Sequence, residues 1–129
     1  MSYKLKIAEA DVYGHKKFAN DRGNTECAVF VQQATGAPKA TLWIMGAKVL
    51  ESDAGKIEKY TAIATFVDGK YPTDDKGKHA AIYLSHDETG IMVLDQWNKQ
   101  GEVLKRKIRS KVAEGTIRSN DANWFYVID

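Results

Sequence analysis

The chain has 129 residues, 43% of them hydrophobic, and its 19 Lys and Arg against 17 Asp and Glu leave a formal net charge of +2. This size supports one ordinary hydrophobic core, and no linker-like stretch divides it, so we expect a single domain over residues 1–129. The balanced charge gives no reason to predict a nucleic-acid partner. No apolar run approaches the length of a membrane span, so no membrane insertion is expected.

The N-terminal segment argues against a secretory signal. Charged side chains interrupt Met1–Val12, where a signal peptide would need an uninterrupted apolar core. We therefore expect a chain made in the cytoplasm without a cleaved signal. Residues 3–20 are predicted to form a short helix or an irregular arm. Its expected core anchors are Tyr3, Leu5, Ile7, Val12 and Phe18.

A short amphipathic helix is predicted over residues 25–35. Asn24 or Thr25 is a suitable N-cap, and Gly36 is a suitable stop. Between them, apolar side chains recur at i, i+3, i+4 and i+7, which is the spacing of one buried helix face. The members of this stripe are Cys27, Phe30, Val31 and Ala34.

Cys27 is the only cysteine of the chain, and it falls in the first turn of the predicted helix. A lone thiol forms no intrachain disulfide, so its value lies in packing or in reactivity. The unpaired N–H groups and the positive dipole end of a first turn favour a thiolate and can stabilise an oxyanion. The same residue also fits as a small apolar member of the core stripe. The helix alone leaves both interpretations open.

Strand-like patterns dominate the rest of the chain. Residues 41–46 are predicted to form a short helix or turn, and residues 61–67 alternate and are β-branched, which is typical of a strand. An apolar hairpin is expected next, with a loop at 86–90. Its strands and those that follow are predicted at residues 79–85, 91–97, 103–112 and 124–128. We expect an α+β fold in which four to five mostly antiparallel strands carry the cysteine helix on one face.

The predicted hairpin brings a histidine and a carboxylate together. The polar segment 71–78 delivers His79 to the start of one strand, and the returning strand ends at Asp95 and Gln96. Since strand side chains alternate, only one of Asp95 and Gln96 can share a face with His79. A loop with an odd number of residues selects Asp95, and an even number selects Gln96. Either side chain can fix the tautomer of the imidazole.

A cysteine that opens a helix, followed by a strand that opens His-x-x-Ile-Tyr-Leu, resembles the NlpC-type branch of the papain-like cysteine peptidases. These are bacterial cell-wall amidases and endopeptidases. Most of the chain also resembles a family of small bacterial proteins that includes amidase effectors of type VI secretion systems. The segments that carry this resemblance are Cys27–Gln32, Trp43 with Gly46, Thr61–Phe66, His79–Leu84, Gly90–Trp97 and Phe125–Ile128.

The resemblance implies a catalytic triad of Cys27, His79 and Asp95, with no cofactor and no metal. It implies an amide of peptidoglycan stem peptides as substrate, secretion, and action in the periplasm of a target bacterium. A cognate immunity protein is then the expected partner. Side chains expected to support the triad or the substrate are Gln96, Trp97, Asn24 and Tyr13.

Other features have simpler interpretations. The basic run at 105–111 is expected to form the charged face of an edge strand, or a contact surface for carboxylate-bearing peptides. His15 and His86 lie in polar surroundings and are expected at the surface. One Cys and three scattered His show no metal-ligand spacing. The alternative to an enzyme is a papain-like binding module in which Cys27 is unreactive and the surface makes protein contacts.

Overall fold

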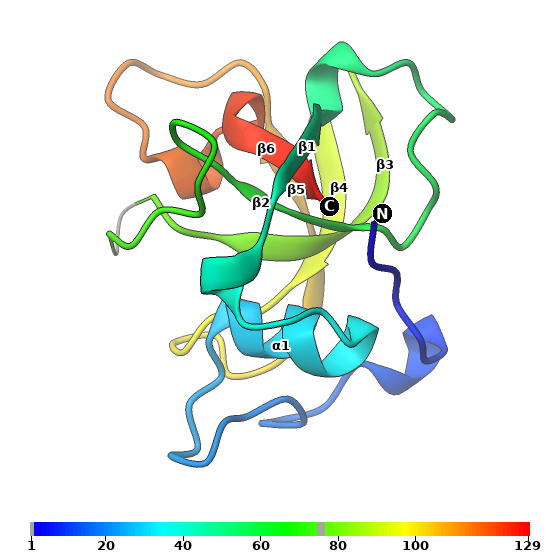
Figure 1. Ribbon diagram of the computed structural model, residues 1–129, viewed down its shortest axis with the longest axis vertical. Helices are drawn as coiled ribbons and strands as arrows, with labels where there is room; N and C mark the ends of the chain where they lie inside the picture. Colours follow the sequence, from blue (N-terminus) through cyan, green and yellow to red (C-terminus); the bar gives the residue numbers. More distant parts are fainter. Residues whose placement is uncertain (1, 75–76) are drawn as a thin grey trace.

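The computed structural model packs a nine-residue helix, α1 (Cys27–Thr35), against an antiparallel sheet of six strands (Figure 1). It describes residues 2–74 and 77–129. Met1, and Asp75 and Lys76 of the polar segment 71–78, lie outside the described residues. The strands are β1 (Met45–Lys48), β2 (Ala62–Thr65), β3 (Ala80–Asp87), β4 (Gly90–Asp95), β5 (Leu104–Arg109) and β6 (Phe125–Ile128). Short 3₁₀ turns are η1 (Glu9–Asp11), η2 (Ala40–Leu42), η3 (Val49–Glu51), η4 (Arg118–Asn120) and η5 (Ala122–Trp124).

The strand order is β1-β6-β2-β3-β4-β5, with every neighbouring pair antiparallel. The predicted α+β class is confirmed, but the sheet has one strand more than expected. The extra strand is β1, which replaces the later part of the helix or turn predicted over residues 41–46. Gly46 permits this pairing, because a Cβ there would lie 2.9 Å from the carbonyl oxygen of Val127 on β6.

Strand alternation sorts the apolar side chains into two clusters, one on each face of the sheet. The cluster on the α1 side includes Ala62, Ala80, Ile82 and Leu94 with the buried face of the helix. The second cluster lies behind the sheet and includes Ile63, Ala81, Tyr83, Val93 and Phe125. Both faces of the central strands are therefore buried, and a residue's position in a strand decides which layer it reaches.

The core stripe of α1 is confirmed. Cys27, Phe30, Val31 and Ala34 are all buried, and Gly36 ends the helix with a left-handed φ of 78°. The predicted N-cap is wrong, because the cap position is Glu26 and no side chain caps it.

No helix within residues 2–74 and 77–129 has the length and apolar character needed to cross a membrane.

The predicted N-cap residues have other contacts. Thr25 donates its hydroxyl proton to the carbonyl oxygen of Trp97, 3.3 Å away beyond β4. Asn24 is exposed, and its backbone N–H donates to the side-chain oxygen of Asn20 at 3.0 Å. The chain before α1 is therefore held by tertiary and loop contacts instead of by a local cap.

The N-terminal segment is an irregular arm with one 3₁₀ turn, as one of the two predicted alternatives had it. Val12 and Phe18 are buried in the core on the α1 side, whereas Ile7 is exposed and is not an anchor. The arm is tied to the sheet by the N–H of Leu5, which donates to the carbonyl of Tyr60 at 2.9 Å.

The central hairpin has a shorter turn than predicted. Asp87 pairs with Gly90, so only Glu88 and Thr89 form the connection, and β3 runs two residues into the expected loop. Near the turn, His86 pairs with Ile91. Further on, the register shifts between Tyr83 and Ser85, which leaves one extra residue in β3. This is a β-bulge, and it reverses the face of every side chain beyond it relative to an unbroken ladder.

The bulge decides which polar residue reaches His79. Beyond it Ile82 pairs with Leu94, and continuing this register places Ala80 opposite Gln96 on the α1 side. His79 and Asp95 then share the other face. The even-numbered turn alone would have selected Gln96, so loop length was insufficient to predict the orienting residue.

Gly90 allows a test of this hairpin, because it has φ +150° and an added Cβ would overlap the carbonyl oxygen of Ile108 on β5. Gly90→Ala is expected to lower the free energy of unfolding by about 2–4 kcal/mol, measured by urea denaturation. Gly115→Ala is the matched control, because Gly115 also has a positive φ but nothing lies within 4 Å of its added Cβ. It should cost only about 1–2 kcal/mol. Equal losses would show that the hairpin turn is not sterically constrained.

Candidate active site

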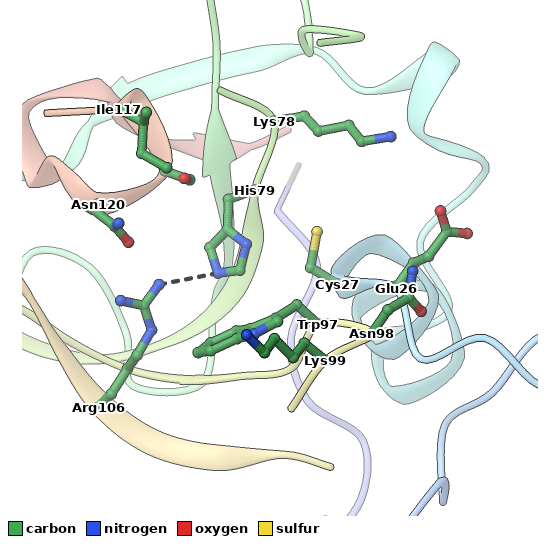
Figure 2. A pocket seen from close by; sticks show the side chains of 11 residues that line it. Glu26, Cys27, Lys78, His79, Trp97, Asn98, Lys99, Arg106, Ile117 and Asn120 are labelled. Carbon is green, nitrogen blue, oxygen red and sulfur yellow. Dashed lines mark hydrogen bonds between the residues drawn. The ribbon is translucent and has the colours of Figure 1, made fainter. Parts of the chain in front are cut away.

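A cavity of about 780 Å³ opens where the start of α1 meets the ends of β3 and β4. Figure 2 shows the Cys27 sulfur on one side of the His79 ring and the Arg106 guanidinium on the other. Polar and charged side chains dominate the rest of the wall. The lining includes Glu26, Cys27, Lys78, His79, Trp97 and Arg106.

His79 and Asp95 form a short hydrogen bond in a dry environment. Nε2 of His79 lies 2.7 Å from Oδ2 of Asp95, and the two side chains are 6% and 0% exposed. Since this contact occupies Nε2, the other ring nitrogen, Nδ1, remains for Cys27. The predicted proximity of the two residues is present, and Asp95 is the one that bonds the ring.

The protonation of His79 and Cys27 follows from their surroundings. Burial alone would lower the pKa of His79, but hydrogen bonds with Asp95 and Cys27, and the charges of both, raise it to about 9. Burial opposes ionisation of Cys27, yet its hydrogen bond with His79 and the imidazolium charge outweigh that cost and lower the pKa of the thiol. The geometry therefore favours a thiolate–imidazolium ion pair.

Cys27 belongs to the core and to the cavity at once. It is 9% exposed, packs in the apolar cluster on the α1 side of the sheet, and also lines the cavity. As the first residue of α1, it lies where backbone N–H groups lack intrahelical acceptors. The two interpretations left open by the sequence are therefore compatible.

Sequence reasoning missed Tyr71. Its hydroxyl lies 3.6 Å from Sγ of Cys27, and its ring packs edge-on against Trp43 with centroids 4.8 Å apart. Burial, followed by the neighbouring Cys27, raises the pKa of Tyr71, so its hydroxyl keeps its proton and can donate to the thiolate. Nothing in the turn-rich segment 71–78 distinguishes this tyrosine as a site residue.

Arg106 was also missed, because it lies within the basic run of β5. Its Nε lies 2.7 Å from Oδ2 of Asp95, the same oxygen that His79 contacts. Its guanidinium carbon lies 5.2 Å from the centre of the Trp97 ring. The remaining basic residues of the run fit the expected charged edge, because β5 ends the sheet and is mostly exposed.

Gln96 points to the opposite layer from Asp95. It is fully buried, and its Nε2 donates to the carbonyl oxygens of Phe18 at 2.8 Å and of Glu26 at 3.0 Å. Glu26 immediately precedes Cys27. Gln96 therefore holds the entry of α1 against β4 and does not line the cavity.

The other predicted supporting residues separate into two groups. Trp97 lines the cavity, and its ring centre lies 6.3 Å from that of His79. Tyr13 and Asn24 are exposed and lie outside the cavity lining. The hydroxyl of Tyr13 donates to Glu9 at 3.3 Å instead. The structure therefore places neither residue where it could support the triad or the substrate.

The two remaining histidines differ from each other. His15 is exposed, as expected. His86 is half-buried at the surface, with Nδ1 at 2.6 Å from the Tyr83 hydroxyl and Nε2 at 2.7 Å from the carbonyl of Ser52. Within residues 2–74 and 77–129, no cluster of three or more His, Cys, Asp or Glu side chains could hold a metal ion.

Comparison with known proteins places these features in a family context. The model of the family domesticated amidase effector 2 matches residues 4–128. A type VI secretion amidase effector 2 protein of Salmonella typhi is 35% identical over 133 residues, which cover 92% of this chain and 98% of that protein. A domesticated amidase effector 2 of Ixodes scapularis is 40% identical over 87 residues, which cover 65% of this chain and 58% of that protein.

Among solved structures, a type 6 secretion amidase effector 2 superposes with a TM-score of 0.75 at 30% sequence identity. The match covers 95% of this chain and 92% of that one. This similarity confirms the papain-like α+β class and the resemblance to type VI amidase effectors that the sequence indicated.

The ionisation of Cys27 can be measured without a substrate. Because its pKa is lowered, iodoacetamide should alkylate the native protein with a midpoint below the value of about 8.5 expected for a free thiol. His79→Ala removes the stabilising bond and charge but leaves the burial, so the midpoint should move above 8.5. His15→Ala, at an exposed ring, is the control. A thiol that resists alkylation until the protein unfolds would contradict the ion pair.

Proposed function

The chain belongs to the domesticated amidase effector 2 family, and from this premise we propose that it is a cysteine hydrolase that cleaves an amide bond in peptidoglycan stem peptides. Cys27 is the nucleophile, His79 the general base and acid, and Asp95 the residue that orients His79. The observation that carries the proposal is the buried contact of 2.7 Å between His79 Nε2 and Asp95 Oδ2, beside the only thiol of the chain.

Acylation begins from the thiolate–imidazolium pair. The sulfur of Cys27 attacks the amide carbonyl carbon, a C–S bond forms, and the carbonyl oxygen becomes an oxyanion. The N–H groups of the first turn of α1, which carries Cys27, are suited to stabilise that charge. When the tetrahedral species collapses, the C–N bond breaks and His79 gives its Nδ1 proton to the leaving amine.

Deacylation reverses the roles. His79, now neutral, takes a proton from a water molecule that attacks the thioester carbonyl. The C–S bond breaks, the carboxylic acid product leaves, and the ion pair is restored. Asp95 keeps Nε2 as the donor throughout, so Nδ1 is always the nitrogen that exchanges protons on the cavity side.

Digestion of purified peptidoglycan sacculi tests the activity and the roles together. The wild-type protein should release fragments that mass spectrometry assigns to one amide bond, and folded Cys27→Ala should release none. Asp95→Asn should lower kcat on the order of 10⁴-fold, because it disturbs the tautomer and removes the counter-charge of the imidazolium.

Gln96→Ala is the neighbouring control. It loosens the entry of α1 but leaves the His79 contact in place, so its kcat should fall far less than that of Asp95→Asn. Cleavage by folded Cys27→Ala at the wild-type rate, or the reverse ranking of the Asp95 and Gln96 variants, would refute the assigned roles.

The names of the relatives support a biological setting. We infer that the protein is an antibacterial effector delivered by a type VI secretion system into the periplasm of a target bacterium. The name of the Salmonella typhi relative describes that protein as a type VI secretion amidase effector. A cognate immunity protein that blocks the Cys27 cavity would protect neighbouring kin.

Compartment-specific toxicity is the expected result. Expression in a bacterial host with a cleavable periplasmic signal should lyse the cells, because cross-linked peptidoglycan is present only outside the cytoplasm. Cytoplasmic expression, and Cys27→Ala in either compartment, should be harmless. Lack of any growth defect from periplasmic wild type, together with intact sacculi, would favour the alternative of a binding module that acts through protein contacts.

A further inference from the structure

We infer that Arg106 is a positioning residue for the proposed hydrolysis: its guanidinium keeps the Asp95 carboxylate fixed on Nε2 of His79 through every protonation state that His79 passes in a catalytic cycle. A Cys–His–Asp mechanism does not require such a residue, and nothing in the local sequence of β5 marks it. The inference rests on the proposed function for its kinetic readout alone.

The two oxygens of the Asp95 carboxylate differ in their hydrogen bonds. Oδ2 accepts hydrogen bonds from both His79 Nε2 and Arg106 Nε, each at 2.7 Å. Oδ1 is buried and has no hydrogen-bond partner among the described residues. All the polar stabilisation of this carboxylate that the structure describes therefore arrives at one oxygen, and Arg106 supplies half of the contacts.

That arrangement matters because the charge of His79 changes during the reaction. A buried carboxylate is stable only while a positive partner compensates for its lost hydration. When His79 is neutral, between acylation and deacylation, the imidazole no longer provides that charge. Arg106 does, because a guanidinium stays protonated at every accessible pH. Arg106 therefore keeps a positive partner on the Asp95 carboxylate and holds that carboxylate in place.

The same contact limits the basicity of His79. Oδ2 divides its negative charge between two donors, and Nη2 of Arg106 lies 3.4 Å from Nε2 of His79. Both effects destabilise the protonated, positively charged form of His79. Without Arg106, Asp95 would stabilise the imidazolium alone, and His79 would become a weaker acid toward the leaving amine.

The position of Arg106 is itself constrained. Val93 of β4 pairs with Arg106 of β5, which puts Arg106 on the same sheet face as Asp95. The indole of Trp97 lies under the guanidinium, and the Arg106 side chain is 26% exposed. Arg106 is thus fixed by the sheet register, a ring and an ion pair, as a positioning role requires.

Among residues 2–74 and 77–129, the titratable groups that contact His79 come from three elements. The ring faces the thiol of Cys27 on α1, the carboxylate of Asp95 on β4 and the guanidinium of Arg106 on β5. Its ring neighbours Trp97 and Phe125, at 6.3 and 6.2 Å between centres, do not titrate. The other titratable groups at Cys27 or on the cavity wall are Tyr71, Glu26, Lys78 and Lys99.

The experiment measures the protonation of His79 directly and kinetics separately. The ring signals of the chain's three histidines are followed by NMR from pH 5 to 11, with His79→Ala used for assignment. The variants are Arg106→Gln, which removes the charge, and Arg106→Lys, which keeps it. Arg109→Gln is the matched control, because Arg109 is an exposed arginine of the same strand that pairs opposite Gly90.

In Arg106→Gln, the pKa of His79 should rise from about 9 by about one unit, and kcat should fall roughly tenfold or more with KM nearly unchanged. Arg106→Lys should hold the His79 titration near the wild-type position and recover part of kcat. Arg109→Gln should match the wild type in both measurements. Combined with Asp95→Asn, Arg106→Gln should shift the His79 titration less than it does alone.

Three results would overturn the inference. An unchanged His79 titration in Arg106→Gln would exclude action on the Asp95–His79 pair. A rise in KM with kcat unchanged would identify Arg106 as a binding residue for a substrate carboxylate instead. An equal titration shift in the Asp95→Asn background would show that Arg106 acts on the imidazole without Asp95. The NMR result stands even if the protein cuts no peptidoglycan, so failure of the proposed function is seen separately.

Discussion

The hydrogen bond between His79 and the buried carboxylate of Asp95 is the interaction on which the rest of the site depends. Asp95 is fully buried, and an imidazole and a guanidinium replace lost hydration at the same carboxylate oxygen. These three side chains come from the start of β3, the end of β4 and the middle of β5. The site therefore requires three adjacent strands in one fixed register, which the β3–β4 hairpin and the pairing of β4 with β5 provide.

Strand alternation directs Asp95 and Gln96, at the end of β4, to opposite layers, and the bulge in β3 decides that Asp95 is the one that faces His79. Asp95 reaches His79 behind the sheet, while Gln96 reaches the carbonyl of Glu26 at the entry of α1. One strand end therefore fixes both the base and the backbone that precedes the nucleophile. A slip by one residue would exchange the carboxylate and the amide, and it would bury the charge among the apolar side chains beneath α1.

Sequence patterns identified Cys27, His79 and the hairpin because helical and strand periodicities are local. They did not identify the bulge, since the stretch from Tyr83 to Ser85 contains neither glycine nor proline and its register is set only by pairing with β2 and β4. The same reason explains the miss at Arg106, which is one of several basic residues along a strand and differs from them only through its neighbours. The strand β1 was missed because its four residues depend on a close backbone approach to β6 at Gly46.

The double role of Cys27 shows how burial and reactivity are reconciled. Desolvation makes a buried thiol harder to ionise, so a core position would ordinarily suppress a nucleophile. Here the same burial removes competing water from the contacts that favour the thiolate, which come from His79, Tyr71 and the backbone of Ala80. Because hydrogen bonds and charges act more strongly at low dielectric, these contacts outweigh the desolvation cost of ionising the buried thiol. The apolar stripe of α1 therefore contributes to reactivity. It fixes the first turn of the helix in a buried environment, where the ion pair of Cys27 and His79 is favoured.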